Sequence, residues 1–152
     1  MVVMSWKPLH FKIIQLSYVL SSDLLKDHAD YDNFHLELFA FNTWEWRELC
    51  NIRLPSSVYP VLDEAIISGS VVYFLFSNYD ILRFDVFSEE YLVISAPSIT
   101  NDTNSYTSRL IKFDEKLTYF SISGDLSWTI WVFNQNRWVK LHVTNYNVGE
   151  NE

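Results

Sequence analysis

The chain has 152 residues, of which 49% are hydrophobic and 17% aromatic, and this composition excludes a disordered or low-complexity protein. Its formal net charge is −8 and its 11 Lys and Arg residues are scattered, which argues against nucleic acid as a partner, because phosphate binding needs a dense basic patch. Cys50 is the only cysteine, so an internal disulfide is ruled out.

The same features indicate a compartment. A lone cysteine is typical of reducing surroundings, and the start of the sequence lacks the charged and then apolar layout of a secretory signal. No stretch approaches the roughly 20 apolar residues that span a bilayer. We therefore expect a protein of the cytoplasm or nucleus that has no membrane partner.

Turn signals divide the chain into strands, taken here from the N-terminus. Residues 1–10 are poorly patterned, and either they supply the innermost strand of a first unit or that strand is missing. Residues 22–28 have helix-like content but are too short to change the fold class. The tail 146–152 is acidic. The predicted strands are 11–20, 34–41 and 45–52, then 63–68, 70–77, 80–87 and 90–96, and then 109–113, 117–123, 128–133 and 137–143.

Three segments of the sequence superimpose without gaps. Each begins with an aromatic residue, has a second aromatic residue seven positions later, and has an aliphatic residue three positions beyond that. The second aromatic residue recurs after 45 and then 47 positions, a period typical of propeller blades. Recurrence at one repeat position favours packing between blades over a ligand cage. The aligned residues are Phe39, Phe84 and Trp131, then Trp46, Tyr91 and Trp138, and then Leu49, Ile94 and Leu141.

The sequence thus predicts an all-β, partial β-propeller of about three four-stranded antiparallel blades, with repeats at 11–53, 63–98 and 108–145. A propeller closes with about four to eight blades, so an arc of three leaves two apolar blade faces bare. Bare faces of that size exceed what soluble monomers usually tolerate. We expect the chain either to be a piece of a longer propeller, which we favour, or to pair with something.

These residues resemble the F-box-associated domain of plant F-box proteins, a propeller-like domain related to kelch repeats. The resemblance covers about residues 11–143 and rests on four motifs in the right order. The inner strand departs from the family, because Phe74 stands where a tryptophan is usual and its glycine-to-tyrosine spacing is one residue longer. The matching segments are Leu38-Phe39-Ala40-Phe41 with Trp46-Arg47-Glu48-Leu49, Gly69 to Leu75, Ile81 to Tyr91 with Pro97, and Ile130 to Phe133 with Trp138 to Leu141.

The resemblance implies substrate recognition for a ubiquitin ligase of the SCF type. In such proteins an F-box docks the ligase adaptor, and the propeller holds the target protein for ubiquitination. No F-box pattern precedes Phe11, so we expect contact with the adaptor only through an F-box absent from this chain. The alternatives are a kelch-like interaction scaffold unrelated to ubiquitin and a carbohydrate-active propeller enzyme, which would need facing carboxylates.

No residue pattern points to catalysis, a metal or a cofactor. His28, Asp30, Asp32 and His35 include typical metal ligands, but the glycine and bidentate glutamate of an EF-hand loop are missing, and a solvated turn is the simpler interpretation. Cys50 follows Leu49 in a predicted strand without a neighbouring histidine, which indicates a buried, inert thiol. We therefore predict a binding protein and not an enzyme.

Loop placement indicates where a partner would bind. In a four-stranded blade, the loops between strands two and three share a face with the loops that join blades. The longer predicted loops all fall on this face, and elaborated loops usually mark the binding face. Tyrosine is a common anchor in interfaces. The candidate partner-binding residues in these loops are His28, Tyr31, Tyr59, Tyr79 and Tyr106.

Overall fold

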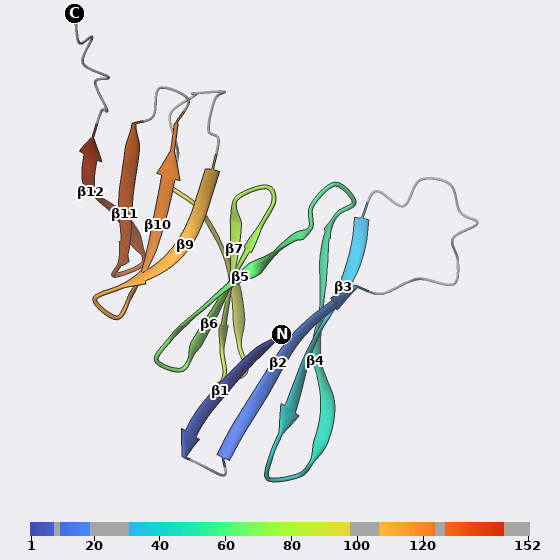
Figure 1. Ribbon diagram of the computed structural model, residues 1–152. Helices are drawn as coiled ribbons and strands as arrows, with labels where there is room; N and C mark the ends of the chain where they lie inside the picture. Colours follow the sequence, from blue (N-terminus) through green and yellow to red (C-terminus); the bar gives the residue numbers. More distant parts are fainter. Residues whose placement is uncertain (8–9, 19–30, 98–106, 124–126, 145–152) are drawn as a thin grey trace, which may run out of the picture. The chain divides into compact units, whose positions relative to one another are not determined.

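The computed structural model describes residues 1–7, 10–18, 31–97, 107–123 and 127–144, which form twelve β-strands and no helix (Figure 1). In this part of the chain, no helix is long and apolar enough to cross a membrane. The predicted all-β class is confirmed. The strands are β1 Val2–Lys7, β2 His10–Tyr18, β3 Tyr31–Ala40, β4 Glu45–Pro55, β5 Pro60–Ser68, β6 Val71–Phe76, β7 Asp80–Asp85, β8 Tyr91–Ser95, β9 Thr107–Phe113, β10 Lys116–Ile122, β11 Trp128–Asn134 and β12 Arg137–Thr144.

The strands form three four-stranded sheets, each built from strands that follow one another in sequence. The orders are β1-β2-β3-β4, β5-β6-β7-β8 and β9-β10-β11-β12. The described strand pairs within them are antiparallel. Such a four-stranded antiparallel meander is the architecture of a propeller blade. The three predicted blades are therefore present.

The first sheet has its innermost strand. Val2 lies opposite Ile14, and Met4 lies opposite Lys12, so β1 pairs with β2 along most of its length. Of the two alternatives that the sequence left open, the structure shows the one in which the N-terminal residues complete the blade. Val2 and Met4, at alternating positions of this strand, are buried apolar side chains.

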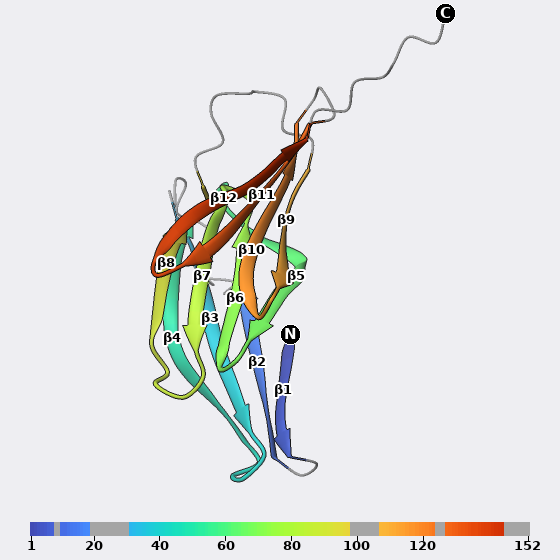
Figure 2. The same cartoon turned by 90° about the vertical axis from the view of Figure 1, so that its left-hand side faces the viewer.

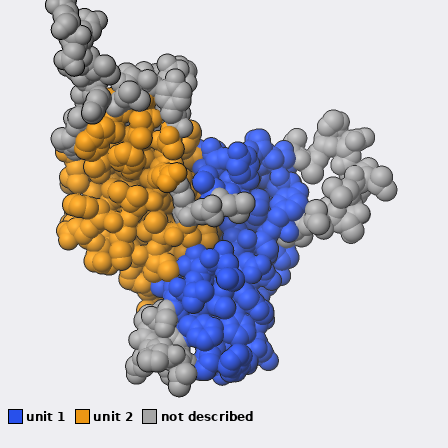
Figure 3. Space-filling model, viewed as in Figure 1, with its two compact units in different colours: residues 1–61, 76–78 blue, residues 62–75, 79–152 orange. Residues whose placement is uncertain are grey.

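The chain divides into two compact units, which Figure 3 shows in different colours. Unit 1 comprises Met1–Val61 and Phe76–Asn78 and contains the first sheet. Unit 2 comprises Leu62–Leu75 and Tyr79–Glu152 and contains the third sheet and most of the second.

Alternation along β3 gives the first sheet one buried face. Ile14, Leu36 and Leu38 on this face are each 0% exposed, and burying one such side chain contributes about 1.5–3 kcal/mol. Residues between them, such as His35 and Glu37, point to the opposite face and are only partly buried. We call this opposite side the outer face of the first sheet. It also carries Val3, Ile13, Phe39 and Trp46, which pair across neighbouring strands.

Strand β6, in the interior of the second sheet, is buried on both faces, whereas the edge strand β8 is mostly exposed. All six residues of β6 are buried, although successive side chains of a strand point to opposite sides. Within unit 2, the indole Nε1 of Trp138 on β12 donates a hydrogen bond to the carbonyl of Ser95 on β8, at 2.9 Å. Ser68 likewise donates to the carbonyl of Glu115, so two contacts tie the second sheet to the third.

Two different hairpin turns join the outer strands of the sheets. In the first and second sheets, the amides of Trp44 and Glu89 donate to the carbonyls of Ala40 and Asp85, at 2.9 and 2.8 Å. Both residues have a left-handed φ, 56° and 59°. The third sheet instead has a two-residue turn at Gln135-Asn136, where both φ values are positive, as a type I′ turn requires.

This shorter turn changes which aromatic residues meet. Phe39 lies opposite Trp46 and Phe84 lies opposite Tyr91, as the sequence repeat suggests. In the third sheet, Trp138 lies opposite Phe133, with ring centroids 5.0 Å apart. Trp131, which aligns with Phe39 and Phe84 in sequence, lies opposite Lys140 instead.

The aligned leucines of the repeat have an unexpected role. Leu49 in β4 and Leu141 in β12 are each skipped by the pairing of their strand with its neighbour, so each is the extra residue of a β-bulge. Ile94, at the same repeat position in β8, is paired normally with Ile81.

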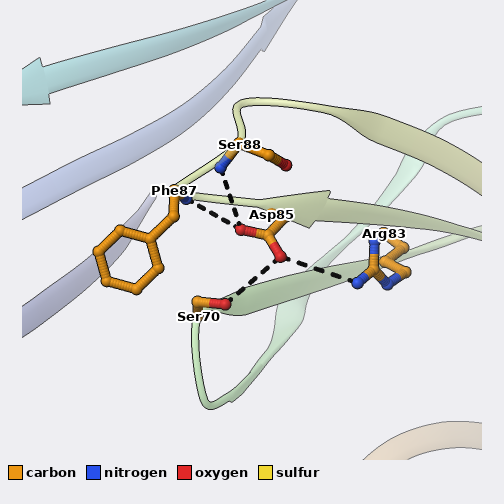
Figure 4. A network of polar contacts seen from close by, with 5 residues as sticks. All are labelled: Ser70, Arg83, Asp85, Phe87 and Ser88. Carbon is orange, nitrogen blue, oxygen red and sulfur yellow. Dashed lines mark hydrogen bonds and ion pairs between the residues drawn. The ribbon is translucent and has the colours of Figure 1, made fainter.

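Several strand ends differ from those predicted. β3 begins at Tyr31, β4 continues to Pro55 and β5 begins at Pro60, so the loop between the strands predicted at 45–52 and 63–68 is reduced to residues 56–59. β7 ends at Asp85 rather than at residue 87, because the carboxylate of Asp85 caps a turn. Its Oδ1 accepts the backbone amides of Phe87 and Ser88, at 2.9 and 3.3 Å. Its Oδ2 accepts Ser70 Oγ at 3.4 Å and lies 3.8 Å from the guanidinium of Arg83 (Figure 4).

We predict that Gly69 stabilises the β5–β6 turn through its backbone alone. Its φ is +59°, and an added Cβ would meet nothing within 4 Å. Gly69→Ala should therefore lower the free energy of unfolding by about 1 kcal/mol, the strain of a left-handed residue. Gly69→Asn should cost less, because asparagine tolerates this conformation. Urea unfolding measures both, and equal losses would contradict the prediction.

We predict that the cap at Asp85 depends on its acceptor oxygen more than on its charge. Asp85→Ala should destabilise the protein by about 1 kcal/mol, as loss of a side-chain cap does. Asp85→Asn retains an acceptor for the two amides and loses only a partly exposed ion pair, which is worth little. In thermal unfolding, the midpoint temperature of Asp85→Asn should be close to that of the wild type, and that of Asp85→Ala should be clearly lower. The reverse order would show that the ion pair dominates.

Candidate partner-binding surface

Exposed tyrosines gather at one end of the first sheet, within unit 1. β2 ends at Tyr18, β3 begins at Tyr31 and β4 ends at Pro55, which is opposite Tyr31, so these three strand ends lie at the same edge. Tyr59 follows four residues after Pro55. The exposed fractions of Tyr18, Tyr31 and Tyr59 are 51%, 45% and 64%. We call Tyr18, Tyr31, Asp32, Arg53 and Tyr59 the tyrosine edge.

Polar contacts hold the first two tyrosines in place. The hydroxyl of Tyr18 donates a hydrogen bond to Asp32 Oδ1, at 3.0 Å. This hydrogen bond is the main reason that the pKa of Tyr18 is raised above its ordinary value, so the phenol stays protonated. On Tyr31, the guanidinium carbon of Arg53 lies 4.4 Å from the ring centroid, a cation–π contact. Arginine and tyrosine are both enriched among the residues that dominate binding energy.

Hydrogen bonds hold the backbone of Tyr59 in place, while its ring is exposed to solvent. The amide of Val58 donates to the carbonyl of Pro55 at 2.8 Å, which closes the turn, and the Val58 side chain is buried. Ser77 then contacts Tyr59 twice. Its hydroxyl accepts the amide of Tyr59 at 3.1 Å, and its amide donates to the carbonyl of Tyr59 at 2.9 Å. An exposed ring on a fixed backbone loses little entropy when it binds a partner.

The structure brings together only some of the candidate residues. Tyr31 and Tyr59 share the tyrosine edge. Tyr79 is exposed and has a φ of 66°, but it belongs to unit 2, where its carbonyl accepts the amide of Ala96. His28 and Tyr106 lie outside the described residues.

Sequence reasoning missed three members of the tyrosine edge. Tyr18 was assigned to the interior of a strand that ends two residues later, Asp32 was weighed only as a metal ligand, and Arg53 was placed beyond the end of its strand. The available signal was that Tyr18 and Tyr31 flank the same long loop and that Arg53 precedes the next one.

No metal site is formed by the part of the chain described: it contains no group of three His, Cys, Asp or Glu residues that could hold an ion. Of the four residues considered from sequence, His28 and Asp30 lie outside the described residues. Asp32 and His35 are three positions apart on β3 and so point to opposite faces.

A row of polar side chains crosses the outer face of the first sheet. Ser17 Oγ donates to Glu37 Oε2 at 2.8 Å, and His35 Nδ1 lies 3.4 Å from Glu48 Oε2. Glu37 and Glu48 are directly opposite each other on β3 and β4. The serine proton is directed to a carboxylate and not to the histidine, so the row lacks the serine–histidine bond of a hydrolase.

Three meander sheets and an exposed edge of tyrosine and arginine define a propeller-type interaction module. The chain belongs to the family of F-box associated beta propeller domains, which matches residues 9–150. The propeller fold expected from the resemblance is thus confirmed. No curated protein sequence matches the chain.

The chain is similar to solved structures that are distant from it in sequence. One is the N-terminal domain of Nup159, with 13% identity, a TM-score of 0.42, and coverage of 79% of this chain and 29% of that chain. Another is a chain of a Saccharomyces cerevisiae complex of Dbp5 with Nup159, Gle1, IP6 and ADP, with 13% identity, a TM-score of 0.44, and coverage of 78% and 29%. The chain therefore spans less than a third of the length of either.

We predict that Cys50 reacts slowly in the folded protein. Burial, and secondarily the negative charge of Glu48, raise the pKa of its thiol. The thiolate is the nucleophile, so at a pH near 8 the folded protein should alkylate with iodoacetamide more slowly than the same chain in denaturant. Raising the pH should narrow this difference. A folded rate equal to or above the denatured rate would contradict the prediction.

Proposed function

We propose that this chain is the target-recognition part of an F-box protein of an SCF-type ubiquitin ligase, and that it acts by binding, without catalysis of its own. The observation that carries the proposal is membership of the F-box associated family along residues 9–150. In this role an F-box contacts the ligase adaptor, and the propeller strands contact the protein that is to be ubiquitinated. Its place of action is the cytoplasm or nucleus, where such ligases work.

The tyrosine edge supports this role as the point of contact. It offers two rings held by neighbouring groups and a third on a fixed backbone. Ordered aromatic side chains provide contact area at low entropic cost, and their alanine variants commonly lose much of the binding energy. The net charge of −8 favours the approach of a target with a basic surface.

The proposal predicts that Tyr31→Ala/Tyr59→Ala loses its target while the fold is retained. Two anchors of this type should together weaken binding by about 100-fold or more. Proteins cross-linked to the chain in cells can be quantified by mass spectrometry for the wild type and the double variant. Tyr91→Ala is the matched control, because Tyr91 is also exposed but lies on β8, in unit 2. The target should be lost in the double variant and retained in the control.

A second measurement separates the ligase from a scaffold. The captured target should accumulate when cullin–RING ligases are inhibited and when this protein is depleted. A target that depends on the tyrosine edge but keeps a constant abundance under both treatments would favour the kelch-like scaffold. Equal capture by the wild type and the double variant would refute the tyrosine edge as the binding site.

A further inference from the structure

The outer edge of the second sheet is regular, unlike the outer edges of the other two sheets. β8 is the last strand of its sheet, and all of its residues pair with β7 in one unbroken register (Figure 2). β4 and β12, the corresponding strands of the first and third sheets, are each interrupted by a bulge. Proteins commonly use a bulge or a charged side chain to keep further strands from joining a free edge. β8 has neither, because its sequence is Tyr91-Leu92-Val93-Ile94-Ser95.

The hydrogen bonds that flank β8 determine which of its backbone groups face β7. The amide of Asp85 donates to the carbonyl of Glu90 at 2.9 Å, and the amide of Ala96 donates to the carbonyl of Tyr79 at 3.1 Å. In an antiparallel pair, residues that exchange hydrogen bonds with the neighbouring strand alternate with residues that do not. Glu90 and Ala96 both belong to the bonded set, so the residues at positions 92 and 94 between them belong to it as well.

The remaining residues of β8 direct their N–H and C=O groups away from β7, toward the free edge. These residues are Tyr91, Val93 and Ser95, and one contact supports the assignment, because the carbonyl of Ser95 accepts the indole N–H of Trp138 on β12 at 2.9 Å. In the part of the chain that the structure describes, the edge-facing groups of Tyr91 and Val93 have no such partner. Two donors and two acceptors are therefore open to a further strand.

The side chains along this edge are apolar and exposed. The exposed fractions of Tyr91, Leu92 and Val93 are 43%, 46% and 42%. Successive side chains of a strand point to opposite faces, so the edge offers apolar contact on both. Glu90, which immediately precedes the strand, is exposed as well and places a carboxylate at this end. The edge thus combines open main-chain groups, apolar contact and a charge at one end.

We propose that β8 binds an extended segment of a partner protein by adding it to the second sheet as a further antiparallel strand. Binding of this kind takes its affinity from main-chain hydrogen bonds and its specificity from alternate side chains. The segment that fits carries β-branched or aromatic residues and has a lysine or arginine near its C-terminal end, which the antiparallel orientation brings to Glu90. The net charge of −8 favours such a basic segment over a second copy of this acidic chain.

This site goes beyond the proposed function, because it uses no residue of the tyrosine edge. β8 belongs to unit 2 and the tyrosine edge belongs to unit 1. The two sites can therefore be tested separately, with variants that change one and leave the other intact.

Amide hydrogen exchange, measured by NMR, tests whether the edge is open. In the free protein, the amides of Tyr91 and Val93 should exchange with solvent faster than the amide of Leu92, which faces β7. Equally slow exchange at all three in dilute protein would refute an open edge. Protection of Tyr91 and Val93 that grows with protein concentration would show that a second copy occupies the edge, and would refute the choice of a partner segment.

A selection from random peptides displayed on phage supplies the probe. The protein used for selection is the Tyr31→Ala/Tyr59→Ala variant, so that peptides specific for the tyrosine edge are not enriched. Synthetic copies of the enriched peptides should slow exchange at the amides of Tyr91 and Val93. The proposal is refuted if no peptide is enriched or if none of the enriched peptides protects these two amides, and neither result would bear on the tyrosine edge.

Val93→Pro tests the main-chain hydrogen bonds. Proline lacks the N–H group and is tolerated in an edge strand where that group faces solvent, so the pairing with β7 should be retained. The dissociation constant of a selected peptide should rise at least about 10-fold, because one of its carbonyls loses its donor. Val93→Thr is the matched control, because threonine keeps both the N–H and the branched shape, and it should bind the peptide like the wild type.

Peptides with N-methyl groups at alternate residues repeat the test without a change in the protein. One set of alternate amides faces β8 and the other set faces solvent. Methylation of the first set should abolish binding, and methylation of the second should not. Equal binding by the proline and threonine variants, or an equal effect of the two methylation patterns, would contradict strand addition.

Discussion

A four-stranded sheet that is apolar on both sides must cover both of them, and most features of this protein depend on how that is achieved. Strand β6 of the second sheet meets the requirement, because each of its residues is buried, whereas Tyr91, Leu92 and Val93 of β8 are exposed. The first and third sheets each bury one face and leave aromatic or aliphatic side chains exposed on the other.

Two kinds of exposed surface differ in shape. The first and third sheets have exposed apolar residues on a face of the sheet. The tyrosine edge instead presents three rings at strand ends, positioned by Asp32, Arg53 and Ser77. Contacts made by the tyrosine edge and contacts made by the exposed rings of Trp44 and Trp46 would therefore use different residues.

Fold class was predictable because its signals are local and repeated. Alternation in residues 34–40 and an aromatic spacing of about 45 residues sufficed for three blades. The gap-free alignment nevertheless assigned Trp131 to the position that Phe133 holds, because a two-residue turn replaces a four-residue turn in the third sheet. One sequence without homologues does not show that the length of a turn differs between repeats. The sequence leaves β1 open, because the burial of Val2 and Met4 depends on the pairing of this strand with β2.

The binding surface was predictable only in part, for a related reason. Tyr31 and Tyr59 were found because tyrosines in loops are frequent anchors. Arg53 and Asp32 contact tyrosines on neighbouring strands. Which residues become neighbours depends on the strand register, and the register cannot be derived from the sequence alone. The bulge at Leu49 shifts that register by one residue between Glu37 and Leu36.

The bulges at Leu49 and Leu141, one in the first sheet and one in the third, also affect solubility. Both lie in strands at the outer edge of their sheets, β4 and β12, whose free backbone groups could otherwise template a further strand from another molecule. An extra residue breaks the flat, evenly spaced ladder that amyloid growth needs. The bulges thereby hinder the addition of further strands to β4 and β12, which matters in a chain with so much exposed aromatic surface.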